Sequence, residues 1–137
     1  MFVEIRTYRL KNGAVPAYLA AVAEGIAIQR RHLDALIGYY FSEIGPINQI
    51  VHIWAFASLD DREARRSRLN ADPEWQAFLP RIRDLIETAE TKIMKPAAFS
   101  PTPPLPEAAE AEAAHAEPPA AAPPAAPPPA AARPDTA

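Results

Sequence analysis

The sequence has no cysteine among its 137 residues, so disulfide bonds and thiolate chemistry are excluded. Its four glycines, Gly13, Gly25, Gly38 and Gly45, are scattered, and no glycine-rich loop is available to hold a phosphate. The three histidines lack the spacing of metal ligands, and neither an HExxH motif nor a catalytic Ser-His-Asp order is evident. The sequence therefore predicts no nucleotide site, no metal and no cofactor, and it assigns no catalytic residue.

Neither charge nor hydropathy indicates a nucleic acid or a membrane as a partner. Residues 1–100 carry 13 Lys and Arg against 12 Asp and Glu, whereas nucleic-acid binders usually show a strong basic excess. The N-terminus lacks the apolar run of a signal peptide. The most apolar stretch, Leu36–Ala57, is interrupted by Glu43, Pro46 and Asn48, which argues against a membrane span. We therefore expect a cytoplasmic protein.

The distribution of proline divides the chain into two parts. Of 17 prolines, 12 lie at or beyond Pro101. Residues 1–100 hold nearly all the large apolar side chains and predict one domain of ordinary size. Residues 101–137 are rich in Pro, Ala and Glu, and after Leu105 they contain no apolar side chain larger than alanine or proline. Such a segment cannot bury enough apolar surface to fold, so we predict a disordered tail.

Hydrophobic periodicity over residues 1–100 predicts the order β-α-β-β-α-β. The expected segments are a strand at Phe2–Leu10, a helix from about Val15, a hairpin with its turn at Gly45-Pro46, helical stretches from Ser58 and from Pro73, and a strand at Lys92–Lys95. This is the ferredoxin-like α+β plan. It implies an antiparallel sheet in the strand order 4-1-3-2, with the helices on one face.

The third predicted strand, Ile50–Ala57, indicates an assembly. Its residues are apolar in both parities apart from His52, whereas a half-solvated strand alternates apolar with polar residues. Both faces of the sheet therefore need cover, and the helices supply only one. We expect a second copy of the chain to cover the other face, which would give a homodimeric α/β barrel.

Five residues are candidates for binding a ligand. Arg6 and Tyr8 share a parity on the first strand, and His52 and Trp54 share one on the third, its predicted neighbour. Their convergence would form a pocket for a small planar or anionic molecule, in the barrel interior or between sheet and helices. Glu43 is the only carboxylate in the hairpin and a candidate general base. The alternative is that all five are polar or aromatic groups paired without function.

A row of arginines follows the hairpin on the next helical stretch. Arg62, Arg65, Arg66 and Arg68 could meet an anionic partner, although such a charged helix face is more often simply solvated.

Three stretches resemble the NIPSNAP family: EIRTYRL from Glu4, GYYFSEIGPINQIVHIWAFASLDDR from Gly38, and DPEWQAFL from Asp72. The resemblance covers about residues 1–101 and implies a ferredoxin-like fold that forms a dimeric α/β barrel. It implies no particular activity. Other proteins with this barrel include cofactor-free monooxygenases, haem-degrading enzymes and dye-decolourising peroxidases, and a fold alone does not establish function. Haem binding would need an axial ligand, for which His52 is the one candidate.

Three functions follow as hypotheses. The first is a small-molecule site in a homodimeric barrel. The second is a non-enzymatic interaction or scaffold module that uses the tail or the arginine row. The third is a cofactor-independent, monooxygenase-like enzyme.

Overall fold

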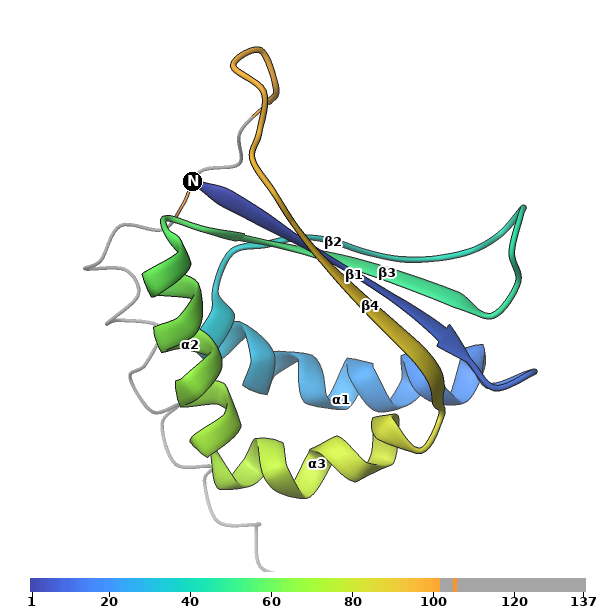
Figure 1. Cartoon of the computed structure of the whole chain (residues 1–137). Helices are drawn as coiled ribbons and strands as arrows, with labels where there is room; N and C mark the ends of the chain where they lie inside the picture. Colours follow the sequence, from blue (N-terminus) through green and yellow to red (C-terminus); the bar gives the residue numbers. More distant parts are fainter. Residues whose placement is uncertain (102–104, 106–137) are drawn as a thin grey trace, which may run out of the picture.

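A four-stranded antiparallel sheet carries all three helices on one face, as the computed structural model shows (Figure 1). The structure describes residues 1–101 and residue 105. The elements are β1 (Phe2–Leu10), α1 (Val15–Leu33), β2 (Leu36–Phe41), β3 (Gln49–Phe56), α2 (Leu59–Ala71), α3 (Pro73–Arg83) and β4 (Ile86–Met94). The ferredoxin-like α+β prediction is confirmed. The predicted tail lies outside the described residues, apart from positions 101 and 105.

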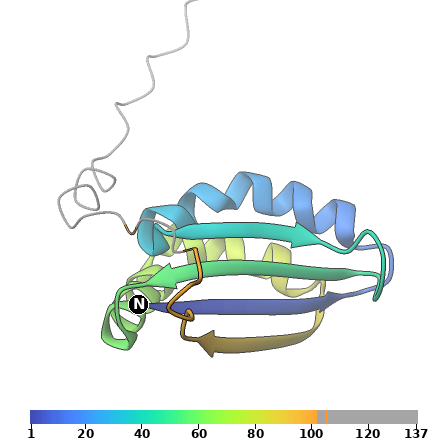
Figure 2. The ribbon, with the colours of Figure 1, turned by 90° about the horizontal axis from the view of Figure 1, so that it is seen from above.

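The strand order β2-β3-β1-β4 places β1 and β3 in the centre of the sheet, as predicted (Figure 2). Both neighbours of β1 run antiparallel to it, and Arg6 lies directly opposite His52 on β3. Central strands are paired on both sides, so their side chains are held in a fixed register. The two central strands are therefore rigid supports for any site beneath the sheet.

Capping residues fix where α2 and α3 begin. The Ser58 hydroxyl accepts a hydrogen bond from the Asp61 N–H at 3.0 Å, and the Asp72 carboxylate accepts one from the Glu74 N–H at 2.8 Å. Pro73 occupies the first turn of α3, where its missing N–H costs nothing. Asp72 also lies 2.7 Å from the Nε2 atom of His32, and this contact ties the end of α1 to the junction between α2 and α3.

The last strand is longer than the predicted Lys92–Lys95 and begins at Ile86. Helix α3 ends shortly before it, at Arg83. Strand β4 lies at the sheet edge, and every residue after Ile86 in it is exposed. An exposed edge strand has no buried face, and it therefore lacks the alternation by which strands are recognised.

A close approach between two helices holds the helical layer together. A Cβ atom at Gly25 of α1 would lie 2.3 Å from the Phe78 ring of α3, far inside van der Waals contact. A side chain at this position would force the Phe78 ring to move, and the helix α1 runs through Gly25 without interruption. Within the part of the chain that the structure describes, no helix is long and apolar enough to span a bilayer.

The two faces of the sheet differ in character. Charged and aromatic side chains of β1 and β3 lie under the helices, and three of them, Glu4, His52 and Trp54, are at most 1% exposed. The opposite face presents Val3, Ile5, Val51 and Ile53, which are only partly buried. This arrangement reverses the usual one, in which the polar face of a sheet meets solvent.

Candidate functional site

The structure brings Arg6, Tyr8, His52 and Trp54 together on the helix-covered face of the sheet. Arg6 and His52 are cross-strand partners, and the centroids of the Tyr8 and His52 rings lie 5.0 Å apart. The indole N–H of Trp54 donates to Nδ1 of His52 at 2.8 Å. The predicted pocket was placed either in the barrel interior or between the sheet and the helices. In a barrel made of two sheets packed face to face, the interior would be enclosed by the faces that carry no helices. The cluster lies on the helix-covered face, so the prediction of a barrel interior is corrected.

The hydrogen bond from Trp54 fixes the tautomer of His52. An indole N–H can only donate, so Nδ1 accepts and the proton of the neutral ring sits on Nε2. Burial lowers the pKa of His52 to about 3, and the nearby positive charges of Arg6 and Arg66 act in the same direction. The ring is therefore neutral at pH 7. Among the described residues, Nε2 has no hydrogen-bond partner although it is buried.

Glu43 does not join this cluster. It lies exposed in the connection between β2 and β3, a loop that extends past the end of the sheet (Figure 1). Positive φ angles at Gly45 (110°) and Asn48 (61°) shape this loop. The side chain of Asn48 accepts from the Gly13 N–H at 3.3 Å and so fastens the loop to the β1–α1 turn. Glu43 is held on the solvent side of this loop, away from the other four candidates.

The carboxylate at the centre of the site is Glu4, which sequence reasoning missed. It is fully buried, and Arg62 and Arg66 of α2 donate to its two oxygens at 2.8 and 2.5 Å. Burial alone would raise the pKa of Glu4, but Arg66 and Arg62 outweigh burial and hold the pKa below its ordinary value. The sequence did contain a signal for Glu4, because alternate residues of a strand share a face and Glu4 therefore lies on the same face as Arg6 and Tyr8.

The arginine row on α2 is mostly engaged within the domain, which corrects its reading as a solvated face or a contact for an anionic partner. Arg62 and Arg66, four residues apart, turn inward to Glu4. Arg65 pairs with Asp61 at 2.7 Å and donates to the Leu33 carbonyl at 3.3 Å. Of the row, only Arg68 is exposed.

A cavity of about 310 Å³ lies between the sheet and the helices, beside this cluster. Polar groups from both layers face it, including Arg6, Tyr8, Gln29 and Arg66. Its apolar wall comes mainly from α2, α3 and the start of β4, and consists of Leu69, Trp75, Leu79, Ile82, Ile86 and Ala89. Concave, mostly apolar sites with a few polar groups are typical of small-molecule binding.

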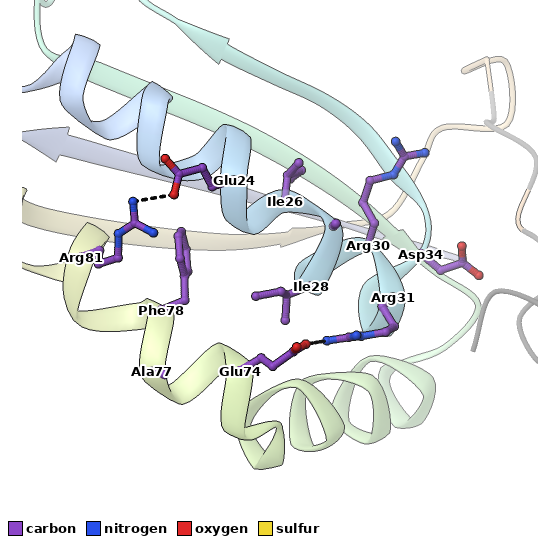
Figure 3. Close-up of a pocket in the computed structure, with 11 residues that line it drawn as sticks. Glu24, Ile26, Ile28, Arg30, Arg31, Asp34, Glu74, Ala77, Phe78 and Arg81 are labelled. Atoms are coloured by element: carbon purple, nitrogen blue, oxygen red, sulfur yellow. Dashed lines mark hydrogen bonds and ion pairs between the residues drawn. The ribbon is translucent and has the colours of Figure 1, made fainter. Parts of the chain in front are cut away.

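A larger groove of about 1050 Å³ runs between α1 and α3 on the outside of the helical layer (Figure 3). Four of its charged side chains pair with one another across the groove: Glu24 with Arg81 at 2.7 Å, and Arg31 with Glu74. Asp34 pairs with Arg65 at 3.7 Å, and Arg30 is exposed. Most of the charge in this groove is therefore paired within the domain or lies in solvent. The inner cavity, where buried donors lack acceptors, is therefore the better candidate.

The sequence model of the NIPSNAP family matches residues 3–101, which include all described helices and strands except for Phe2, the first residue of β1. The chain belongs to the NIPSNAP family. It is 30% identical over 93 residues to a NipSnap homologue of Dictyostelium discoideum, covering 68% of this chain and 41% of that protein. The chain spans 18% to 41% of the length of the curated relatives from Caenorhabditis elegans, Dictyostelium and Drosophila melanogaster.

Solved structures of bacterial NIPSNAP proteins share the fold. One from Agrobacterium tumefaciens, described as having unknown function, is 74% identical with a TM-score of 0.73, covering 74% of this chain and 92% of that chain. One from Burkholderia xenovorans is 41% identical with a TM-score of 0.72, covering 74% of this chain and 100% of that chain. An antibiotic biosynthesis monooxygenase is 16% identical with a TM-score of 0.52, covering 71% of this chain and 99% of that chain, so that likeness shows the fold alone.

Replacing Glu4 by Gln tests the buried ion pair of this NIPSNAP domain. The substitution keeps the shape of the side chain but leaves the guanidinium groups of Arg62 and Arg66 without a countercharge. We expect the free energy of unfolding in urea to fall by about 3 kcal/mol. The control is Glu87→Gln, whose partner Arg9 is 72% exposed, and we expect it to change stability by less than about 0.5 kcal/mol. If the two substitutions reduced stability equally, the ion pair of Glu4 would be no more important than an exposed one.

Buried, neutral His52 makes stability depend on pH. Its pKa in the folded domain is about 3 against an ordinary value of 6.5, so below pH 6.5 the unfolded chain binds a proton that the folded one does not. Stability therefore falls as the pH is lowered from 6.5, by at most about 1.4 kcal/mol per pH unit.

Urea unfolding between pH 7 and pH 5 measures this effect. In His52→Asn, the amide oxygen can still accept from Trp54, but the titrating group is gone. We expect the wild type to lose about 2 kcal/mol relative to this variant over that range. Parallel pH profiles for the two proteins would contradict this, because they would show that His52 takes up its proton as readily in the folded domain as in the unfolded chain.

Proposed function

We propose that this NIPSNAP domain binds a small organic molecule in the inner cavity between the sheet and the helices. The observation that carries the proposal is the cavity itself, about 310 Å³ in size, which lies beside buried polar groups rather than in a purely apolar core. Two of the predicted binding residues, Arg6 and Tyr8, line it. We place His52 and Trp54 behind them as the groups that shape and stiffen this wall.

We further propose that the domain functions as a homodimer through the open face of its sheet. Val3, Ile5, Val51 and Ile53 form an apolar strip there, and Tyr40 beside it is 54% exposed. Contiguous exposed apolar surface on a soluble domain usually marks an interface. A second copy supplies an identical strip, so a two-fold axis through this face would cover both strips at once.

A variant that fills the cavity tests the binding proposal. Ala89 lines the cavity from the exposed edge strand β4, so Ala89→Phe should occupy the space without disturbing the core. We expect fragments below about 300 Da that raise the melting temperature of the wild type to have no effect on this variant. Thr88→Phe lies on the same exposed strand but on its opposite face, outside the cavity lining, and serves as the matched control. If the fragments bound equally to the wild type and to both variants, the ligand would not lie in this cavity.

Analytical ultracentrifugation tests the dimer. We expect the wild type to sediment as a dimer at micromolar concentration. Ile53→Asp places a charge on the apolar strip and should shift the population to a folded monomer, because an unpaired charge in an interface costs several kcal/mol. Ser67→Asp, on the exposed side of α2, should leave the dimer intact. A wild-type monomer, or an unaffected Ile53→Asp dimer, would exclude this interface.

A further inference from the structure

The inner layer holds more positive than negative charge. Arg6, Arg62 and Arg66 lie beneath the sheet, and the only carboxylate that the structure describes among them is that of Glu4, which Arg62 and Arg66 share. His52 adds no charge, because its pKa lies near 3. Three guanidinium groups therefore face one carboxylate, and Arg6 has no acidic partner among the residues that the structure describes.

The cavity lining has the same imbalance. Of its 13 residues, three are arginines, Arg6, Arg66 and Arg83, and none is acidic. Burial lowers the pKa of Arg66, and the neighbouring charge of Arg6 lowers it further. Two guanidinium groups that repel each other across a partly buried space would both be stabilised by an anion placed between them.

Hydrogen-bond donors in this layer also outnumber the acceptors. Three buried nitrogen atoms beneath the sheet have no hydrogen-bond partner among the described residues: Nε of Arg6, Nε of Arg62 and Nε2 of His52. Given the tautomer of His52, all three are donors. Leaving a buried donor unpaired costs about 1–3 kcal/mol. The group that completes this layer must therefore be an acceptor.

Arg6 is the one member of this set that also lines the cavity. Its guanidinium carbon lies 5.5 Å from the centroid of the Tyr8 ring, within the range of a cation–π contact that orients the group. Burial raises the pKa of Tyr8, so its phenol remains protonated. The polar wall of the cavity thus presents a fixed cation and a neutral hydroxyl, and it contains no anion.

We propose that the ligand is an organic acid whose ionised group binds Arg6, with its apolar body against Leu79, Ile82 and Ile86. Arg66 contributes charge from the α2 side, and Arg83 lies exposed at the end of α3 beside the cavity. The inference rests on the proposed function and narrows its ligand to one class. A guanidinium binds a carboxylate by two parallel hydrogen bonds, whereas a neutral amide of the same shape leaves one donor unpaired and the charge uncompensated.

The test compares acids with amides of the same shape on the full chain. The probes are cyclohexanecarboxylate against cyclohexanecarboxamide, hexanoate against hexanamide, and inorganic phosphate alone. Intrinsic fluorescence reports binding, because the chain has two tryptophans. Trp75 lines the cavity, and the indole of Trp54 donates a hydrogen bond to His52. We expect each acid to bind at least 10-fold more tightly than its amide at pH 7, as the loss of a charged hydrogen bond predicts.

Variants locate the acid. Arg6→Met keeps much of the side-chain stem, removes the charge and should weaken acid binding more than 10-fold while leaving amide binding unchanged. The matched control is Arg9→Met, on the same strand with its side chain 72% exposed, and it should bind like the wild type. The comparison of acid with amide in the wild type needs no variant, so a poorly folded Arg6→Met protein does not block the test.

The outcomes separate the two proposals. Equal binding of acids and amides, abolished by Ala89→Phe, would overturn the organic acid and leave cavity binding in place. Phosphate binding that depends on Arg6 without any binding of the acids would identify an inorganic anion site and also overturn the organic acid. If no probe binds, and Ala89→Phe does not differ from the wild type, both proposals fail.

Discussion

The structure depends on one buried interaction, the ion pair that Arg62 and Arg66 form with the carboxylate of Glu4. This contact joins the central strand β1 to helix α2. The two arginines lie 58 and 62 positions after Glu4 in the chain. A buried carboxylate is tolerated only when it is paired and hydrogen-bonded, so this contact fixes where α2 crosses the sheet. Because α2 leads directly into α3, the same contact also sets the position of the wall that closes the inner cavity.

The two faces of the sheet have different functions in this account. The helix-covered face carries the charges and rings of β1 and β3, and these groups cannot pack to the density of an apolar core without satisfying their hydrogen bonds. Beside the cavity, some of the buried hydrogen-bond donors still lack an acceptor among the described residues. The open face is apolar, and in the proposed homodimer a second copy of the chain covers it. Binding and assembly would therefore use opposite sides of the same two strands, and each could change without disturbing the other.

The sequence predicted much of the fold because most elements have local signals. The helical stretches predicted from Ser58 and from Pro73 begin where the side chains of Ser58 and Asp72 cap α2 and α3. The residue pattern also placed β1 correctly, and it placed β3 to within one residue at each end. β4 was cut short because an exposed edge strand has no periodic burial. The site was harder to predict. The parity of Arg6, Tyr8, His52 and Trp54 was visible, but Glu43 and Glu4 were separated only by tertiary structure, which turns one to solvent and buries the other against α2.

Arg6 is partly buried, and its buried Nε–H has no acceptor among the described residues. We propose that an acidic ligand pairs with this side chain, and the Nε–H resonance tests the proposal most directly. Nuclear magnetic resonance of arginine side chains in the ¹⁵N-labelled protein, with Arg6→Lys to assign the signal, follows this group during a titration with cyclohexanecarboxylate. We expect a slowly exchanging Arg6 Nε–H whose resonance shifts with the acid and not with cyclohexanecarboxamide. An Arg6 signal that stays unchanged while resonances elsewhere in the domain move with the acid would contradict it.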